Sequence, residues 1–312
     1  MKFFKKIILF ILFSSLFFIC IIGSYVYKYD LDWDDIPPPK FTSSFSFNDK
    51  LEFSRNKKVD ILSIGSSMTL NNLSSKIVMD RLKSKSYLNL SSWGVKLKTD
   101  FDLLKIQTKI KKPKSLIFVS NIIDFTAKGK NDLDENEYKI NKIVEYLMST
   151  KSIFYHLEYF NLKYYFRESL LKKEYKSGRN FSMTLKYDDN GGIQIDSKNF
   201  QYNLQRWNNS FIEEPENIYY IYLDSISNYC KENNIQFFFF QSPTREKTLI
   251  KKDSEILLTH CKKVENIVCN RGGNFVNSNE RKWDDSFFID GIHLNGDGAD
   301  QFTTYCFNRI GF

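Results

Sequence analysis

The sequence is poor in the residues that build metal sites. Its 312 residues include five cysteines and three histidines. Their spacing does not match the Cys/His patterns that hold a structural zinc ion. The chain also has no internal repeat. We therefore expect a non-repeating globular fold without a zinc site.

The net positive charge of the chain is not gathered in one basic stripe. Forty-five Lys and Arg residues against 37 Asp and Glu residues give a net charge of +8. The lysines are spread along the whole sequence, with no basic stripe and no nucleic-acid-binding motif. We interpret them as solvated surface residues and expect no nucleic-acid partner.

One segment near the N-terminus lacks charge altogether. Residues 7–27 are uncharged and follow three lysines within the first six residues. As a helix they would span about 30 Å, the thickness of a bilayer's hydrocarbon core. No small-x-small cleavage site follows, so we interpret residues 1–28 as a signal-anchor transmembrane helix rather than a cleaved signal peptide. The N-terminal lysines should stay cytoplasmic, which predicts a single-pass protein of the cytoplasmic (inner) membrane with its remainder on the extracytoplasmic, periplasmic side.

The remainder divides into a short tether and one large domain. Residues 29–55 contain the acidic run DLDWDD and three consecutive prolines, a composition typical of a semi-rigid spacer. Residues 56–312 are enough to bury a full hydrophobic core.

Apolar runs and helical patterns alternate along this domain. We expect strands at 59–65, 87–94, 115–121, 235–241 and near Phe275. We expect helices at about 69–84, before Pro113, at about 216–232 and 254–270, and from about Asn295. Strands separated by helices of this length predict an α/β fold, a parallel sheet covered on both faces in three layers.

The interval 127–213 interrupts this alternation. It holds an aromatic-rich helical stretch and then a segment that reads as a hairpin turning at Asp-Asn-Gly-Gly. We interpret it as a long insertion. A lid, a substrate wall, a docking surface and a structural extension of the core all remain open.

Four cysteines follow the apolar segment, in the part expected outside, where disulfides are permitted. Cys261 and Cys269 are expected on one helix about 12 Å apart, too far to bridge each other. One bond from this pair to Cys230 or Cys306, or buried free thiols, are the two alternatives.

Two of the three histidines, His156 and His260, lie in helical patterns and are expected to be structural. His293 differs because Asp290 precedes it by three residues, just before the last expected helix. A carboxylate so placed can accept a hydrogen bond from one ring nitrogen, while the other nitrogen faces a hydroxyl group. Taken alone, this spacing is equally typical of a cap or an ion pair.

The ends of the first three strands supply further candidates. Ser67 follows the first strand in a Gly-Ser-Ser turn, Gly94 ends the second and Asn121 ends the third. A serine after such a glycine can cap a helix or present a reactive hydroxyl. Because the carboxyl ends of parallel strands share one sheet edge, we expect these residues to meet Asp290 and His293.

This ordered set resembles the SGNH (GDSL-type) hydrolase superfamily, whose four blocks contribute Ser, Gly, Asn and His. The resemblance covers roughly residues 57–126 and 284–308. It implies that Ser67 is the nucleophile, His293 the general base and Asp290 the residue that orients it. It also implies an oxyanion hole formed by the backbone N–H groups of Ser67 and Gly94 with the amide of Asn121. The absence of a Gly-x-Ser-x-Gly elbow disfavours the ordinary α/β-hydrolase fold.

The sequence departs from the family pattern in two blocks. Ser66 stands where the first block usually has an acid, and the third block keeps only Asn121 of Gly-x-Asn-Asp. Asp124 is the nearby polar alternative to Asn121. An inactive relative that retains the fold is the alternative reading of these departures.

The resemblance implies acyl transfer through a serine ester, with no metal or organic cofactor. An esterase and an O-acyltransferase share the same triad. The membrane anchor and the aromatic insertion favour O-acyl (acetyl) transfer to, or removal from, cell-envelope polysaccharide, with a membrane protein that delivers the acyl group as a partner. The insertion carries aromatic side chains suited either to stacking on sugars or to packing: Tyr155, Tyr159, Tyr164, Tyr165 and Trp207. A non-catalytic envelope assembly or binding protein and a lipid-directed esterase are the alternatives.

Overall fold

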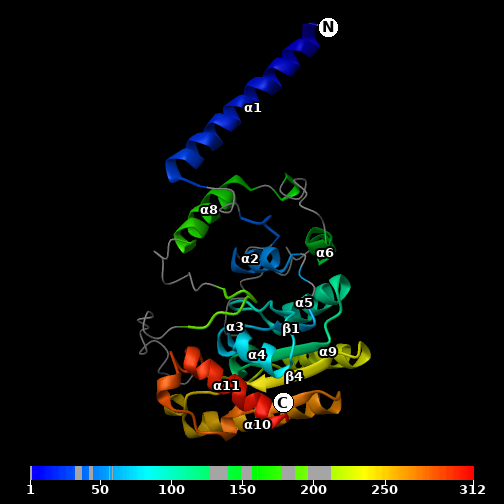
Figure 1. Cartoon of the computed structure of the whole chain (residues 1–312), viewed down its shortest axis with the longest axis vertical. Helices are drawn as coiled ribbons and strands as arrows, with labels where there is room; N and C mark the ends of the chain where they lie inside the picture. The colour runs from blue at the N-terminus through cyan, green and yellow to red at the C-terminus, as the bar shows by residue number, and fades with distance from the viewer. Residues whose placement is uncertain are drawn as a thin grey trace. The chain divides into compact units, whose positions relative to one another are not determined.

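The computed structural model describes residues 2–31, 37–41, 45–55, 57, 59–126, 140–148, 157–159, 161–176, 187–195 and 212–312. The chain divides into two compact units (Figure 1). One comprises residues 1–38 and 160–184, and the other comprises residues 39–159 and 185–312.

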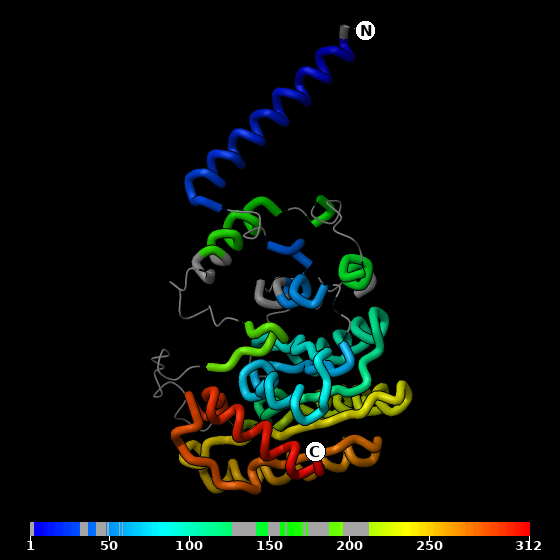
Figure 2. Tube along the Cα trace, in the orientation of Figure 1, coloured from blue at the N-terminus to red at the C-terminus, as the bar shows by residue number. Residues whose placement is uncertain are grey.

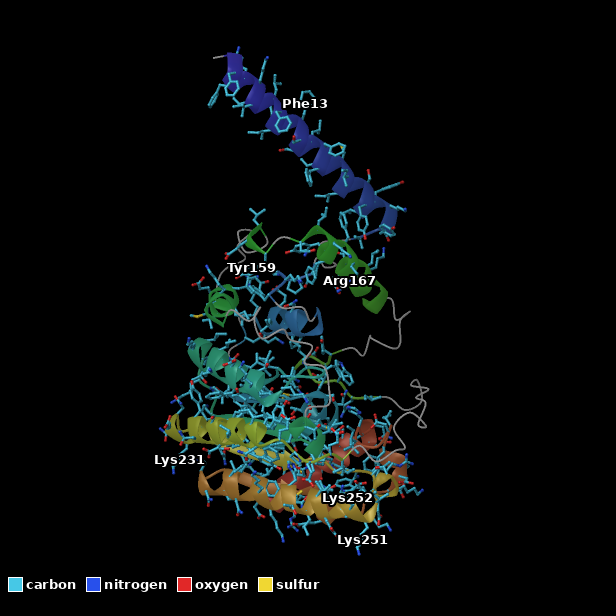
Figure 3. All side chains as sticks on the ribbon, turned by 180° about the vertical axis from the view of Figure 1, so that it is seen from behind. Phe13, Tyr159, Arg167, Lys231, Lys251 and Lys252 are labelled. Carbon is cyan, nitrogen blue, oxygen red and sulfur yellow. The ribbon has the colours of Figure 1, made fainter. Side chains whose placement is uncertain are left out.

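The smaller unit contains two helices, α1 (Lys2–Tyr29) and α8 (Leu162–Lys176). Residues Phe3–Tyr29 form a helix long and apolar enough to cross a membrane, with mean hydropathy 2.7 and none of its most apolar stretch buried. Phe13 projects away from this helix (Figure 3). The helix agrees with the expected anchor in length and composition, while the side of the membrane stays a prediction.

Helix α8 contacts the end of α1. Tyr25 stacks on Phe166 with ring centroids 4.0 Å apart, and its hydroxyl donates to the Phe166 carbonyl at 3.0 Å. Lys173 donates to the carbonyl of Tyr29 at 2.7 Å. Part of the interval interpreted as an insertion is therefore packed against the last turns of the apolar helix.

The larger unit contains a five-stranded parallel sheet. Its strands are β1 (Ile61–Ile64), β2 (Tyr87–Asn89), β3 (Ser115–Ser120), β4 (Gln236–Gln241) and β5 (Asn274–Asn277), in the order β2-β1-β3-β4-β5. The predicted α/β fold is confirmed. This order places a topological switch point between β1 and β3, where the carboxyl ends of α/β sheets bind ligands.

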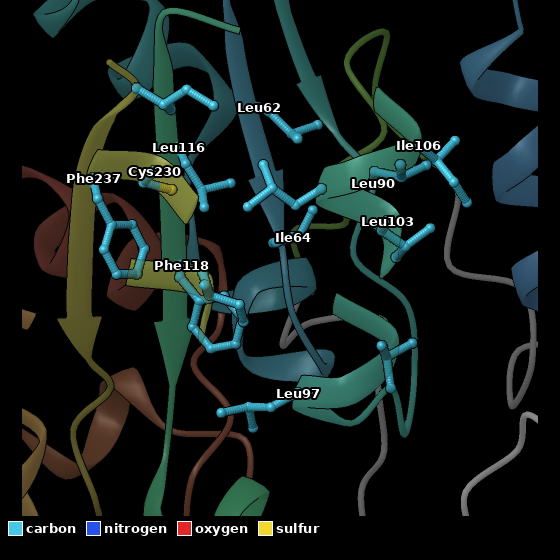
Figure 4. Close-up of a cluster of buried hydrophobic side chains, with 14 of the residues drawn as sticks. Leu62, Ile64, Leu90, Leu97, Leu103, Ile106, Leu116, Phe118, Cys230 and Phe237 are labelled. Carbon is cyan, nitrogen blue, oxygen red and sulfur yellow. The ribbon is translucent and has the colours of Figure 1, made fainter. Parts of the chain in front are cut away.

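Strand side chains alternate between two helical layers. Leu62, Ile64 and Phe118 face a layer formed by α5 (Leu97–Ile110), α9 (Asn217–Glu232) and α10 (Lys251–Asn270) (Figure 4). Ile61 and Phe240 face the opposite layer, formed by α3 (Ser67–Asn72), α4 (Ser75–Arg81) and α11 (Gly296–Arg309). Helix α11 (red), near the C-terminus, packs against the early helices α3 and α4 (cyan) in this layer (Figure 2).

The helix expected over 69–84 was predicted wrongly as one element, because α3 and α4 are separate. Leu73 between them is extended, with φ −108° and ψ 123°. The N–H of Ser74 donates to Thr303 Oγ1 on α11 at 2.9 Å rather than to a carbonyl one turn earlier. Tertiary hydrogen bonds thus replace helical ones at the break.

Other boundaries shift by smaller amounts. Strand β2 ends at Asn89 instead of residue 94, and the remaining residues run as a loop to Gly94, whose φ is +68°. Helix α10 begins at Lys251, earlier than expected. Asn295 caps α11 as predicted, accepting from the N–H of Gly298 at 2.9 Å.

The interval expected as a tether contains a helix, α2 (Phe45–Ser54). Leu51 is fully buried in the main core, and Phe41 is buried beside it. Buried residues of this segment therefore join the larger unit.

The described parts of the interval 127–213 contain α6 (Ile140–Met148), α8 and a turn. The N–H of Gly191 donates to the Asp188 carbonyl at 3.0 Å, which places a turn at the Asp-Asn-Gly-Gly sequence, but residues 187–195 form no strand. Tyr159 packs against Phe41 with ring centroids 5.0 Å apart, and buried Tyr164 donates to the Pro38 carbonyl at 3.2 Å. Tyr165 packs edge-on against the ring of Tyr164. The predictions for Tyr155, His156 and Trp207 lie outside the described residues.

All five cysteines fall within the described residues, and all are free thiols. Cys230, Cys261 and Cys306 are buried. Burial raises the pKa of the Cys230 thiol to about 12. The alternative of buried free thiols is therefore the one the structure shows for these three.

Candidate active site

The turn after β1 requires a glycine at its first position. Gly65 has φ +140°, and a Cβ atom there would lie 2.2 Å from Thr69 Oγ1. The Thr69 hydroxyl lies 2.7 Å from the carbonyl oxygen of Val119 and accepts from the Val119 N–H at 2.9 Å. The close approach of Thr69 thus fastens the turn to β3 and fixes the start of α3.

The two serines of the turn have different partners. Ser66 is the N-cap of α3, and its hydroxyl accepts from the N–H of Met68 at 3.2 Å. Ser67 is the first residue of the helix and is half-buried. The cap and the candidate nucleophile are therefore neighbouring serines.

The structure brings Ser67, His293 and Asp290 together. Ser67 Oγ lies 2.9 Å from His293 Nε2, and His293 Nδ1 lies 2.7 Å from Asp290 Oδ2. The other oxygen of Asp290 accepts from the backbone N–H groups of Ile292 at 2.8 Å and His293 at 2.7 Å. The carboxylate thereby holds both the imidazole and the loop that carries it.

The electrostatics of Asp290 suit this geometry. Burial acts to raise its pKa, but the charge of His293 and the hydrogen bonds from His293 and Ile292 outweigh burial, and the pKa lies below its usual value. An ionised Asp290 keeps a proton on Nδ1 of His293, which leaves the Nε2 lone pair facing the Ser67 hydroxyl.

A buried asparagine on α3 braces the histidine loop. Asn72 Nδ2 donates to the carbonyl of Ile292 at 3.0 Å and to Ser242 Oγ at 2.7 Å, while Asn72 Oδ1 accepts from the N–H of Leu294 at 2.8 Å. It thus holds the backbone on both sides of His293. Sequence reasoning missed Asn72, although an amide within an apolar helical pattern is a signal for such a role.

The expected oxyanion-hole residues lie at the same sheet edge. Gly94 is half-buried, and the ring of Trp93 beside it lies 5.9 Å from the His293 ring. Ser67 begins α3, so its backbone N–H has no acceptor earlier in the helix. Trp93 was not identified from the sequence, because its place depends on the loop that follows the shortened β2.

Asn121 is buried and already hydrogen-bonded. Its Nδ2 donates to Thr244 Oγ1 at 3.0 Å and to the Ser242 carbonyl at a longer 3.4 Å. In the described part of the chain, no hydrogen bond joins Asn121 to Ser67 or His293. The N–H group in the longer bond is the one that could turn toward an oxyanion.

Asp124 supports the turn instead of replacing Asn121. It accepts from the Asn121 N–H at 3.0 Å and the Ser120 hydroxyl at 2.8 Å, and it hydrogen-bonds with Ser66. A carboxyl group therefore still lies beside the turn, although Ser66 replaces the acid within it. Burial raises the pKa of Asp124, and these hydrogen bonds oppose that shift.

A second buried acid, Asp100 on α5, lies near Asp124. Burial and then the charge of Asp124 raise the pKa of Asp100 well above its usual value. Burial lowers the pKa of neighbouring Lys96, whose ammonium group donates to the Thr126 carbonyl at 3.1 Å. Buried polar and charged side chains therefore lie close to the turn.

His260 has the structural placement that its helical pattern predicts. Its Nδ1 lies 2.8 Å from the Tyr220 hydroxyl, inside the layer of α9 and α10. Burial, and then the charge of Lys263, lower its pKa to about 3. Among the described residues, no group of three or more His, Cys, Asp or Glu side chains could hold a metal ion.

The chain matches no protein-family model and no curated protein. Solved structures that it resembles include a catalytic mutant of an acetylxylan esterase from Geobacillus stearothermophilus, at 10% identity and TM-score 0.43 over 82% of this chain and 97% of that one. Another is a putative acylhydrolase from Bacteroides fragilis, at 11% identity and TM-score 0.40 over 83% of this chain and 93% of that one. A third is a GDSL-like lipase from Bacteroides thetaiotaomicron, at 10% identity and TM-score 0.37 over 80% of this chain and 88% of that one. Likeness at this level assigns neither a substrate nor a residue role to this chain.

Proposed function

We propose that this protein carries out serine-dependent acyl-ester chemistry. The observation that carries the proposal is the continuous chain of hydrogen bonds from Ser67 Oγ through His293 to Asp290, at 2.9 Å and 2.7 Å. A hydroxyl, an imidazole and an ionised carboxylate in this order form the activated nucleophile of acyl transfer.

The reaction would proceed in two halves. As Ser67 Oγ bonds to the ester carbonyl carbon, His293 Nε2 takes the hydroxyl proton, and the carbonyl oxygen becomes an oxyanion. The backbone N–H groups of Ser67 and Gly94 and the Asn121 amide are the proposed donors to that oxyanion. The intermediate then expels the alcohol, which leaves with the proton from His293, and Ser67 keeps the acyl group.

The second half regenerates the serine by the same steps in reverse. Water attacks the acyl-serine in an esterase, and a sugar hydroxyl attacks it in an O-acyltransferase. We propose the latter, acting on envelope polysaccharide outside the cytoplasmic membrane, with a membrane partner that supplies the acyl group. The apolar helix α1 supports a membrane location, and half-buried Trp93 beside His293 offers an aromatic surface for a sugar.

The described aromatic residues of the insertion lend less support to transfer. Tyr159 and Tyr164 are occupied by packing and hydrogen bonding within their own units. Stacking on sugars and structural packing were the two alternatives for these aromatic residues. The contacts of Tyr159 and Tyr164 favour packing.

Partitioning of the acyl-enzyme tests transfer against hydrolysis. The full chain in detergent would be acylated with 4-nitrophenyl acetate, and the acetyl adduct on Ser67 followed by intact mass with and without envelope oligosaccharides. Transfer predicts faster loss of the adduct and an acetylated sugar product, because a bound acceptor has a high effective molarity. Free acetate at an unchanged rate with every sugar would favour an esterase. No adduct at all would favour a binding protein.

A further inference from the structure

A recess lies at the carboxyl ends of β4 and β5. It is a pocket of ≈ 440 Å³ between the start of α10, the loop after β4 and residues 277–283. None of Ser67, Asp290 and His293 lines it. The carboxyl edge of an open parallel sheet is where α/β proteins bind their ligands, so the pocket lies where a substrate subsite is expected.

One loop connects this pocket to the candidate active site. Thr244 lines the pocket, and its Oγ1 accepts from Asn121 Nδ2 at 3.0 Å. The next residue, Arg245, donates its N–H to the carbonyl of Gly291 at 2.9 Å, within the loop between Asp290 and His293. The loop after β4 therefore forms a wall of the pocket and also contacts the oxyanion-hole asparagine and the histidine loop.

The pocket wall offers hydrogen-bonding groups that are still available. Asn277 Oδ1 accepts from the Asn279 N–H at 3.1 Å, but Asn277 Nδ2 donates to no acceptor within the described residues. The Thr244 hydroxyl accepts from Asn121, and its own proton has no acceptor within the same residues. Both groups can therefore donate to a ligand hydroxyl or carbonyl.

Charge and shape narrow the ligand class. Two acids, Glu246 and Glu280, balance two bases, Arg281 and Lys282, and Lys282 pairs with Glu246 at 3.4 Å. This balanced charge offers no preference for an ion, and three leucine side chains line the same pocket. Amide and hydroxyl donors beside apolar side chains suit a neutral sugar, which presents both hydroxyl groups and apolar ring faces.

We propose that this pocket binds a neutral sugar residue of the carbohydrate whose acyl ester reacts at Ser67. The proposal rests on the ester chemistry proposed above and adds the subsite that recognises the carbohydrate. Because Ser67, Asp290 and His293 do not line the pocket, it supplies affinity for an oligosaccharide and does not change the chemical step. Filling it should raise KM for a sugar ester and leave kcat and small-ester turnover unchanged.

Neighbouring residues of α10 provide a matched pair of variants. Leu258 and Thr259 are both exposed, but only Leu258 lines the pocket. Leu258→Trp should fill the pocket, and Thr259→Trp places the same side chain outside it. Full chains in detergent would be assayed with 4-nitrophenyl acetate and with O-acetylated xylo- and chito-oligosaccharides. We expect Leu258→Trp to raise KM for a sugar ester at least about tenfold, with kcat and 4-nitrophenyl acetate turnover within about twofold of the Thr259→Trp values.

Calorimetry with the non-acetylated oligosaccharides separates this proposal from the ester chemistry. The wild-type chain and Thr259→Trp should bind one of these sugars, and Leu258→Trp should not, whether or not the protein turns over any ester. Equal sugar affinity and equal KM in both variants would overturn the proposal. The proposal would also be overturned if Leu258→Trp lost turnover only of 4-nitrophenyl octanoate, because the pocket would then be an acyl-chain site. Failure of Ser67 to form an acyl adduct would instead overturn the proposed function.

Discussion

Two histidines of this chain each meet a hydroxyl group, in different layers of the larger unit. At the sheet edge, His293 lies 2.9 Å from Ser67 Oγ and 2.7 Å from Asp290. Between α9 and α10, His260 lies 2.8 Å from the Tyr220 hydroxyl, and its Nε2 has no partner among the described residues. The distance to the hydroxyl is nearly the same in the two pairs.

What differs is the third group and the access to solvent. Asp290 stabilises an imidazolium at His293 and fixes its tautomer, and Ser67 is only half-buried. Within the described residues no carboxylate pairs with His260, and burial lowers its pKa to about 3. A histidine beside a hydroxyl becomes a candidate base only where a carboxylate supports the charge that it must accept.

The largest expected effects come from breaking the His293 pair. Ser67→Ala and His293→Ala should each lower kcat/KM for a small acetyl ester by at least about 10⁴-fold, because nucleophile and base act as one unit. The double variant should be no worse than either single variant. Purified full chains assayed with 4-nitrophenyl acetate give the comparison, and near-normal turnover by Ser67→Ala would contradict it.

Removing the carboxylate charge of Asp290 should lower ester hydrolysis less than removing Ser67 or His293. Asp290→Asn keeps much of the loop geometry but no longer stabilises the imidazolium, and we expect a loss of roughly 10⁴-fold in kcat, smaller than the loss in Ser67→Ala. In the wild type, the lowered pKa of Asp290 means that its stabilising contribution is present above the unfolded-state pKa and is lost as the pH falls through the folded-state value. A variant as active as the wild type would show that Asp290 only shapes the loop.

The His260 pair should affect stability and leave chemistry alone. At about pH 7.5, His260→Phe should lower the free energy of unfolding by about 1–3 kcal/mol, because the buried Tyr220 hydroxyl loses its partner. The folded-state pKa of His260, about 3, lies below its unfolded value, so its contribution is present above roughly pH 6.5 and is lost as the pH falls. The difference in free energy of unfolding between the wild type and His260→Phe should therefore be smaller by roughly 2 kcal/mol at about pH 5 than at about pH 7.5.

Tyr220→Phe is the matched control for that variant. It removes the hydroxyl but keeps the titrating imidazole, so it should retain the wild-type dependence of stability on pH. Chemical unfolding at the two pH values measures both variants. Two results would contradict the assignment of His260 as structural. One is a difference in free energy of unfolding between the wild type and Tyr220→Phe that shrinks at the lower pH, and the other is a large loss of ester hydrolysis in His260→Phe.

The smallest expected effect comes from Ser66. Ser66→Ala removes the cap of α3 and a hydrogen bond to Asp124, which should lower the free energy of unfolding by about 1 kcal/mol. Ester hydrolysis should fall only several-fold at most, in contrast to Ser67→Ala. Thermal melting and the acetyl-ester assay on the same preparation would show whether two adjacent serines separate in this way.

The sequence predicted the parts of the site that depend on residue type and topology. Ser67, Asp290 and His293 stand out because they end a strand or precede a helix, and a parallel sheet brings such positions to one edge. The break between α3 and α4 could not be predicted, because it depends on Thr303 and Leu294, which are distant in sequence. The role of Asn72 could not be predicted either, because its hydrogen bonds to the backbone of the histidine loop join residues that are distant in sequence.

Labelling with a serine-reactive fluorophosphonate, mapped by peptide mass spectrometry, shows whether Ser67 is a nucleophile activated by His293. We predict one adduct, on Ser67, in the wild type and in His260→Phe. The adduct should be absent in Ser67→Ala and strongly slowed in His293→Ala, because the reagent reports an activated hydroxyl. Labelling of a different serine, or equal labelling of the wild type and His293→Ala, would contradict the account of Ser67 as a nucleophile activated by His293.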